Sequence, residues 1–214
     1  MKEKGSKLLG LVFYYLPTLK KVSKKTRKLF EKHGFFPWFT KGFEVFLALE
    51  LLLHITTPKI ITEFGSGRST HTISYFSSSK KTNFISIEQN YSFHLKNKIS
   101  FKLGYLDTKH LYHVSIVNDW FDLKKINTIP NIKKTELLFL DAPGGVGNKG
   151  GRRDSLEAIK FVDELNDLQV LVVDDYDRQD AKSSVDGILQ TRKNQTTKFI
   201  TNYADTNQLL IVFF

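Results

Sequence analysis

The spacing of hydrophobic positions changes near residue 59. Before it, apolar residues recur at helical spacing after Pro17, and residues 41–54 are apolar around most of a helical surface. These patterns predict helices over 5–33, broken at Pro17, and over 41–54. Beyond it, short apolar runs alternate with helical stretches. The expected strands are 59–64, 83–88, 110–117, 136–141, 170–174, 198–202 and 209–214, and the expected helices are 69–77, 91–99, 155–165 and 180–191.

This alternation predicts the fold class. Strands that alternate with helices form a mostly parallel sheet covered by helices on both faces. The last two strands follow each other without a helix, so we expect them to pair as an antiparallel hairpin. The chain is therefore interpreted as an α/β domain over residues 43–214, preceded by a helical extension over residues 1–42.

Positive charge is concentrated in this extension. The whole chain carries +10, and residues 1–42 account for +9, with eleven Lys and Arg against two acids. Such a segment suits an anionic partner: a membrane surface, nucleic acid or an acidic protein. Its apolar run, residues 8–16, is shorter than the roughly 20 residues that span a bilayer. We expect either peripheral contact with an anionic membrane or packing on the body or on a second copy in a homo-oligomer.

The chain contains no cysteine. Disulfides and cysteine-ligated zinc are therefore excluded, and the cytosol is the expected compartment. With the basic extension, the expected location is the cytoplasm, with peripheral contact at the inner face of the membrane as the second interpretation.

The first candidate site is the glycine turn after the strand 59–64. Gly65 and Gly67 let the backbone approach a ligand closely, and the following helix offers free N–H groups. Glu88 ends the next strand about 20 residues later, where an acid can accept both ribose hydroxyls of a nucleotide. The alternative is a plain tight turn and a surface glutamate. A dinucleotide fingerprint needs a third glycine, but Thr70 stands there.

Glu63-Phe64-Gly65-Ser66-Gly67-Arg68-Ser69-Thr70, followed by Ser86-Ile87-Glu88, resembles the first two motifs of class I S-adenosylmethionine methyltransferases. The resemblance covers residues 43–214. It implies a Rossmann-like fold with a seven-stranded sheet and a reversed C-terminal hairpin, and it implies S-adenosyl-L-methionine as cofactor. The residues expected at the cofactor are Glu63, Gly65, Ser66, Gly67, Ser69, Thr70, Glu88, Gln89, Asn118, Asp119 and Asp141.

Within that set the resemblance implies distinct roles. Gly65 and Gly67 would lie under the methionine part, Glu63 near its amino group through water, and Glu88 at the ribose. Asn118 and Asp119 would lie near the adenine, or would simply be a polar pair in a loop.

Two acidic loops are expected at the same edge of the sheet. Asp141 follows one strand, and Asp174 and Asp175 follow the next, where open α/β sheets bind ligands. Three carboxylates could hold Mg²⁺ or Mn²⁺, which would orient a substrate hydroxyl and lower its pKa. In the alternative, Asp141 and Asp174 cap loops and Asp175 is solvated. Asp141 and Asp175 are the candidate catalytic residues, and the general base is unassigned.

The same loops resemble those of sugar-modifying enzymes. Asp174-Asp175-Tyr176 with Ser184-Val185-Asp186 is similar to the metal-binding segment of macrocin-type O-methyltransferases. Asp141-Ala142-Pro143 with Gly151-Arg152 is similar to a loop of glucuronoxylan-type O-methyltransferases. Pro143-Gly144-Gly145 stands where the macrocin-type loop carries further acids. The candidate substrate-binding residues are Arg152, Arg153 and Tyr176.

The two arginines belong to a glycine-rich basic loop. They could bind an anionic sugar, because a guanidinium forms paired hydrogen bonds with a carboxylate. The alternative is a solvated loop in which they pair with Asp154 or Glu157.

The predicted function is S-adenosylmethionine-dependent O-methylation of a sugar or another small hydroxyl acceptor. RNA methylation is the alternative enzyme activity. The basic extension favours it, but the near-neutral body and the lack of an Asn/Asp-Pro-Pro-Tyr motif oppose it, so nucleic acid is not an expected partner. A third hypothesis is a non-catalytic scaffold of the same fold at a membrane surface, which would need neither the glycine turn nor Glu88.

Overall fold

The computed structural model describes residues 43–80, 82–104, 107–143, 156–192, 197–203 and 207–214. Contacts divide the chain into two units, Met1–Thr57 with Asn202–Thr206, and Pro58–Thr201 with Asn207–Phe214. The helix expected over 5–33 and the rest of the extension lie outside the described residues. The domain boundary at residue 42 therefore stays a prediction.

In the first unit, helix α2 spans Phe43–Thr56. Its sequence contains five Leu and two Glu, which are strong helix formers. The helix ends where Thr57 adopts a left-handed backbone, with φ of 45°, directly before Pro58. This element confirms the helix expected over 41–54, displaced by two residues. Its buried side chains recur at helical spacing and are Val45, Ala48, Leu49, Leu52 and Leu53.

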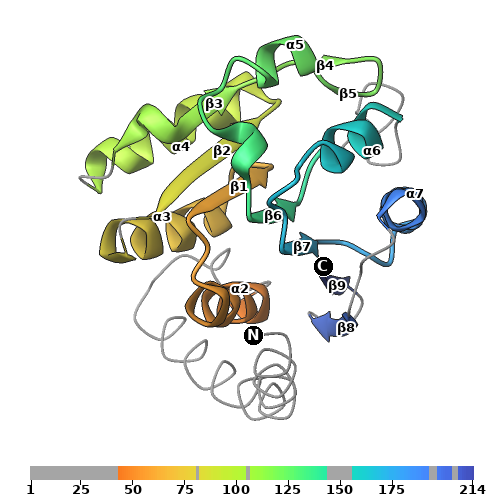
Figure 1. Ribbon diagram of the computed structural model, residues 1–214. Helices are drawn as coiled ribbons and strands as arrows, with labels where there is room; N and C mark the ends of the chain where they lie inside the picture. The colour runs from red at the N-terminus through yellow and green to blue at the C-terminus, as the bar shows by residue number, and fades with distance from the viewer. Residues whose placement is uncertain (1–42, 81, 105–106, 144–155, 193–196, 204–206) are drawn as a thin grey trace. The chain divides into compact units, whose positions relative to one another are not determined.

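In the second unit, strands and helices alternate as expected (Figure 1). The strands of the main sheet are β1 (Ile60–Phe64), β2 (Asn83–Glu88), β3 (Leu111–His113), β6 (Leu137–Leu140), β7 (Val170–Val173), β8 (Thr197–Tyr203) and β9 (Asn207–Phe213). The helices are α3 (Arg68–Lys80), α4 (Tyr91–Leu103), α5 (Leu123–Ile126), α6 (Leu156–Asp163) and α7 (Gln179–Thr191), with short 3-10 turns at Thr108–His110 and Ile132–Lys134. Within the described ranges, no helix is long and apolar enough to cross a membrane.

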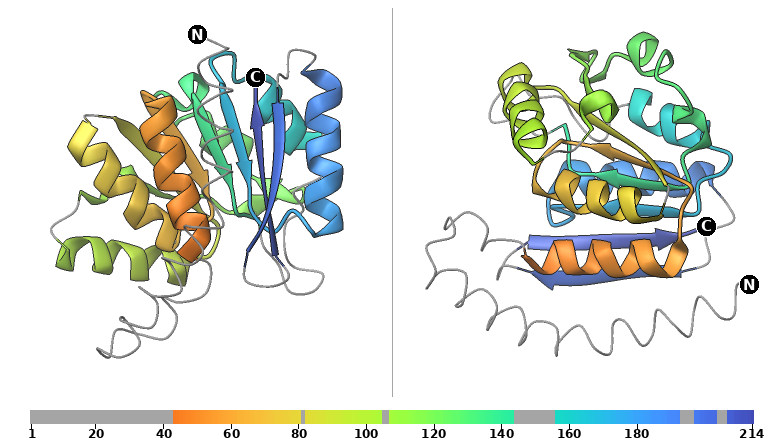
Figure 2. Two further views of the ribbon diagram at one scale, coloured as in Figure 1. Left: turned by 90° about the horizontal axis from the view of Figure 1, so that it is seen from below. Right: turned by 90° about the vertical axis from the view of Figure 1, so that its left-hand side faces the viewer.

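Among the described residues, seven strands form one sheet in the order β3-β2-β1-β6-β7-β9-β8. The first five of these are parallel to one another, and β9 runs antiparallel to β7. Figure 2 shows the two C-terminal strands running beside each other. The order confirms the Rossmann-like sheet with its reversed terminal hairpin. The direction of strand addition reverses between β1 and β6, and such switch points are where open sheets bind ligands.

Helices cover both faces of this sheet, which explains its continuous apolar strands. Every residue of β1, β6 and β7 is buried, as is typical of central parallel strands. On one face, the ring of Phe64 contacts Trp120, Phe121 and, edge to face, Phe161 of α6. In the layer formed by α3 and α4, the rings of His71 and Phe101 lie 4.8 Å apart.

The run expected as one strand over 110–117 is divided in the structure. Only β3 joins the main sheet, while β4 (Ile116–Val117) pairs with β5 (Trp120–Phe121) in a separate two-stranded sheet. Asn118 and Asp119 form the turn between them, with φ of 52° and 64°. Asn and Asp tolerate this left-handed conformation, which a two-residue hairpin turn requires. The hydrophobic pattern alone did not reveal this turn.

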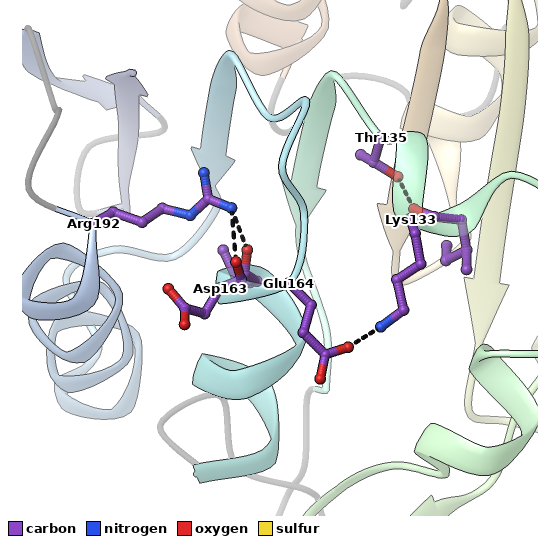
Figure 3. A network of polar contacts seen from close by, with 7 residues as sticks. Lys133, Thr135, Asp163, Glu164 and Arg192 are labelled. Carbon is purple, nitrogen blue, oxygen red and sulfur yellow. Dashed lines mark hydrogen bonds and ion pairs between the residues drawn. The ribbon is translucent and has the colours of Figure 1, made fainter.

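Polar contacts join the end of α7 to the end of α6 (Figure 3). The Arg192 guanidinium donates to the carbonyl oxygens of Val162, at 2.6 Å, and of Leu165, with a longer contact to that of Asp163. The backbone N–H groups of Leu165 and Leu168 already donate to the carbonyls of Val162 and Leu165, so Arg192 adds a second donor to each of these two. The contact holds two helices of the same layer in fixed positions.

Candidate functional site

The carboxyl ends of adjacent strands place the predicted site residues in one row. Because β2, β1, β6 and β7 are in parallel register, the residues that end or follow them lie side by side. Backbone hydrogen bonds extend this register beyond the sheet. The N–H groups of Gly65, Asp141 and Asp174 donate, at 2.8 to 2.9 Å, to the carbonyls of Ile87, Phe64 and Leu140 respectively. The row consists of Glu88, Gly65, Asp141 and Asp174.

Glu88 connects this row to the glycine turn. Its carboxylate is buried, and it accepts the Ser66 N–H at 3.0 Å and the Asn90 N–H at 2.7 Å. Burial raises the pKa of Glu88 above its ordinary value, and these N–H donors partly oppose the rise. Each carboxylate oxygen accepts more than one hydrogen bond. Glu88 therefore retains acceptor capacity for two hydroxyl groups of a ligand.

The two glycines of the turn differ in what surrounds them. Gly65 has φ of 99°, and an added Cβ would lie 3.0 Å from the Cβ of Ala142 and 3.1 Å from the carbonyl carbon of Asp141. Only glycine satisfies both the conformation and the close packing at this position. An added Cβ at Gly67 would meet no atom within 4 Å. The open space beside Gly67 fits a ligand that lies against the turn.

A buried hydroxyl network supports the turn from below. The Glu63 side chain is fully buried, and its carboxylate accepts hydrogen bonds from the hydroxyls of Ser69, Thr70 (2.6 Å) and Ser86 (2.7 Å). The Thr70 hydroxyl also accepts the Gly67 N–H at 2.8 Å. The network of Glu63, Ser69 and Thr70 thus fixes the conformation of the turn through the bond between Thr70 and the Gly67 N–H. Their expected places at the cofactor, through water in the case of Glu63, stay predictions.

This environment shifts the titration of Glu63. Burial raises the pKa of Glu63 to about 7, the three hydroxyl donors oppose the rise, and the nearby charge of Glu88 adds to it. Desolvation therefore outweighs the hydrogen bonds that favour the ionised form. The network contains a carboxyl group that changes its charge near neutral pH.

The three aspartates of the acidic loops lie at the expected edge and are half-buried. Asp175 has a left-handed backbone, with φ of 49°, and its N–H donates to the Asp174 carboxylate at 2.9 Å. In the described part of the chain, no three His, Cys, Asp or Glu side chains are grouped closely enough to hold a metal ion. As placed, Asp141, Asp174 and Asp175 do not form a three-carboxylate metal site, and we derive no catalytic step through a metal.

The remaining predicted site residues have mixed positions. Gln89 follows Glu88 directly and is half-buried. Asn118 and Asp119 lie exposed on the hairpin turn, and the left-handed backbone of that turn is sufficient to explain why Asn and Asp occur there. The Tyr176 side chain is only 7% exposed and belongs to the hydrophobic core, which leaves little of it for a substrate. Arg152 and Arg153 lie outside the described residues.

His113 is not among the site residues expected from sequence, but the register places it beside Glu88 at the end of β3. Its Nε2 lies 3.1 Å from the carbonyl oxygen of Gln89, and the ring of Tyr91 meets it edge-on at 5.3 Å. His94 packs on the same imidazole, and burial lowers the pKa of His94 to about 4. No motif marks these residues. Only their positions at strand and helix ends could have indicated them.

Comparisons with known proteins agree with this architecture. No protein-family model matches the chain, and no curated protein matches its sequence. Among solved structures, cofactor-bound Rv0187 from MTB superposes with a TM-score of 0.59 at 14% identity, covering 90% of this chain and 89% of that one. The O-methyltransferase TomG from Streptomyces achromogenes, in complex with SAM, gives 0.55 at 18% identity, covering 89% and 88%.

A third solved structure extends the same likeness. The SAH-bound methyltransferase PaMTH1 from Podospora anserina gives a TM-score of 0.54 at 11% identity, covering 80% of this chain and 78% of that one. The TM-scores of these three structures establish a shared fold, and sequence identities this low show nothing beyond the fold. The chain therefore has the Rossmann-like fold of the class I S-adenosylmethionine-dependent methyltransferases.

Proposed function

We propose that the protein is an enzyme that binds S-adenosyl-L-methionine and transfers its methyl group to an oxygen of a sugar or another small hydroxyl acceptor. The observation that carries this proposal is the 3.0 Å bond between the Ser66 N–H and the Glu88 carboxylate. It joins the glycine turn and the acid at the end of β2, the two parts that a nucleoside with an amino-acid tail would need.

Each part suits a portion of the cofactor. Glu88 can accept both ribose hydroxyls, because a carboxylate binds two donors at once. The open side of Gly67 leaves room for the methionine portion along the turn. His113 places a flat ring beside Glu88, which suits a purine. When bound, the cofactor supplies a methyl group on a positively charged sulfur.

Methyl transfer is an in-line displacement, so the protein mainly positions the acceptor and removes its proton. Asp141 is next to Gly65 in the row, since its N–H donates to the Phe64 carbonyl at 2.9 Å. It is the carboxylate we propose to orient the acceptor hydroxyl, with Asp175 in support. Metal assistance by Asp141, Asp174 and Asp175 rests on the resemblance of their loops alone, because the described side chains as placed form no metal site.

Calorimetry with S-adenosylhomocysteine tests the cofactor assignment. The wild type should bind, and Glu88→Ala should weaken binding by about 1–3 kcal/mol through lost charge-assisted hydrogen bonds. Glu164→Ala is the matched control, because it removes an exposed carboxylate that pairs with Lys133 at the end of α6. If the wild type binds no S-adenosylhomocysteine at millimolar concentration, the proposal fails.

Methyl-transfer assays separate the proposed activity from its alternatives. Transfer to sugar nucleotides but not to RNA is the expected result. Transfer to RNA alone would replace the proposed acceptor by nucleic acid. Cofactor binding without transfer to any hydroxyl acceptor would favour the scaffold hypothesis.

A further inference from the structure

Helix α4 presents a row of large apolar side chains to solvent. Tyr91, Leu95, Ile99 and Leu103 are 59%, 40%, 59% and 77% exposed. They are spaced four residues apart, so they form one stripe along the helix, which we call the α4 stripe. The opposite face is buried through His94 and Phe101. Figure 1 shows α4 beside β2 and β3, which it contacts.

The α4 stripe is unusual within the part of the chain that the structure describes. Five of the nine exposed large hydrophobic side chains lie on this one helix, because Phe93 is also 54% exposed. Single exposed apolar residues are ordinary, whereas a contiguous apolar surface marks a site of interaction.

Charge on the same helix indicates what kind of surface it meets. Between Tyr91 and Leu103 the helix carries Lys96, Lys98 and Lys102 and no acid. At 100° per residue, Lys102 falls within the stripe, and Lys98 and Lys96 fall on its two flanks. The Lys96 ammonium lies 5.3 Å from the centre of the Phe93 ring. The charged side chains of the helix beside the apolar residues are thus all cations.

An apolar stripe bordered by lysines complements an anionic lipid surface. Such a helix lies in the membrane plane, with its apolar side chains at the headgroup–acyl boundary and its lysines among the headgroups. Tyr91 and Phe93, at the first turn, are residue types suited to that boundary. We propose that α4 docks the protein on anionic phospholipid membranes through the α4 stripe. The basic residues 1–42 add a charge of the same sign.

The docking helix begins at the edge that carries the site. The Asn90 side chain caps α4 by accepting the N–H groups of Ser92 and Phe93, at 3.0 and 3.2 Å. The Asn90 N–H donates to Glu88. A membrane-bound α4 therefore holds the candidate cofactor acid near the lipid surface. The proposal does not depend on methyl transfer, since a protein without catalytic activity could dock in the same way.

Sedimentation of the full chain with lipid vesicles tests the proposal. The chain should pellet with vesicles of phosphatidylglycerol and phosphatidylcholine and stay in the supernatant with phosphatidylcholine alone. Leu103→Glu should weaken partition into anionic vesicles about tenfold or more, because it removes a leucine that would enter the lipid and adds a charge that the anionic headgroups repel. Leu156→Glu is the matched control: Leu156 is 60% exposed on α6, and the charge change is identical.

A fixed salt concentration and a check of the variant's fold are needed to interpret the partition measurements. Partition is compared near 0.15 M salt, where the Debye length is about 8 Å and remote charges are largely screened. S-adenosylhomocysteine binding by Leu103→Glu verifies its fold, or circular dichroism does if the wild type does not bind. Equal partition of both variants, or no pelleting of the wild type, overturns the proposal. So does a dimer in sedimentation velocity that only Leu103→Glu disrupts, since the stripe would then join two copies.

Discussion

Replacement of Glu63 by glutamine probes the buried network beneath the glycine turn. Glu63 is fully buried and its pKa is raised from 4.5 to about 7, mainly by burial. In the unfolded chain it ionises near 4.5, so between the two values the folded state holds a proton that the unfolded state has released. The free energy of unfolding that the protonated Glu63 contributes is therefore fully present below about pH 4.5, and it is lost as the pH rises to about 7.

The size of the effect follows from the shift. One pKa unit corresponds to about 1.4 kcal/mol, so the rise to about 7 is worth about 3 kcal/mol of unfolding free energy. Glu63→Gln does not titrate and should lack this decline between pH 4.5 and 7. The variant keeps the shape of the side chain, and the hydroxyl of Ser69 can rotate to accept the new N–H group.

Urea unfolding of the wild type and of Glu63→Gln at several pH values measures the difference. Other groups also titrate in this range: the pKa of Glu88 is raised by burial, and those of His71, His94 and His110 are lowered by burial. Subtracting the two stability curves removes these common contributions. Parallel curves from pH 4.5 to 7 would show that Glu63 does not titrate there, which would refute the argument.

Three further predictions use other parts of the structure. Gly65→Ala should destabilise the fold by about 1–3 kcal/mol in thermal unfolding, because it forces a strained φ and a 3.0 Å contact with Ala142. Gly67→Ala, with open space around the added Cβ, is the control. Equal losses in the two variants would contradict the specific requirement for glycine at position 65. Arg192→Ala should cost about 1–3 kcal/mol of unfolding free energy, because it removes the guanidinium bonds to three carbonyls at and just beyond the end of α6, and Lys182→Ala, a half-buried cation of α7, should cost less. If the acidic loops hold a cation, methyl transfer should fall in excess chelator and return with Mg²⁺ or Mn²⁺, whereas full activity in chelator would remove the metal from the proposal.

Local sequence patterns predicted most of the fold. The strand expected over 83–88 is β2, and most later elements fall within a few residues of their predicted positions, except that the run 110–117 is divided and that β5 and α5 were not expected. Hydrophobic spacing encodes these elements directly, because a helix or strand must place its apolar side chains on the buried face. The glycine turn was also recognisable from sequence, since Gly65 adopts a conformation that few other residues can.

Tertiary structure decided how separate elements meet. The bonds on Glu63 come from α3 and from β2, and the place of His113 beside Glu88 depends on strand register. The same register sets the row of acids, while packing buries Tyr176. Such contacts join residues far apart along the chain, so no local pattern encodes them. Sequence by itself determined the order of elements and the turn, whereas register and side-chain packing, which exist only in the folded chain, determined the environment of each site residue.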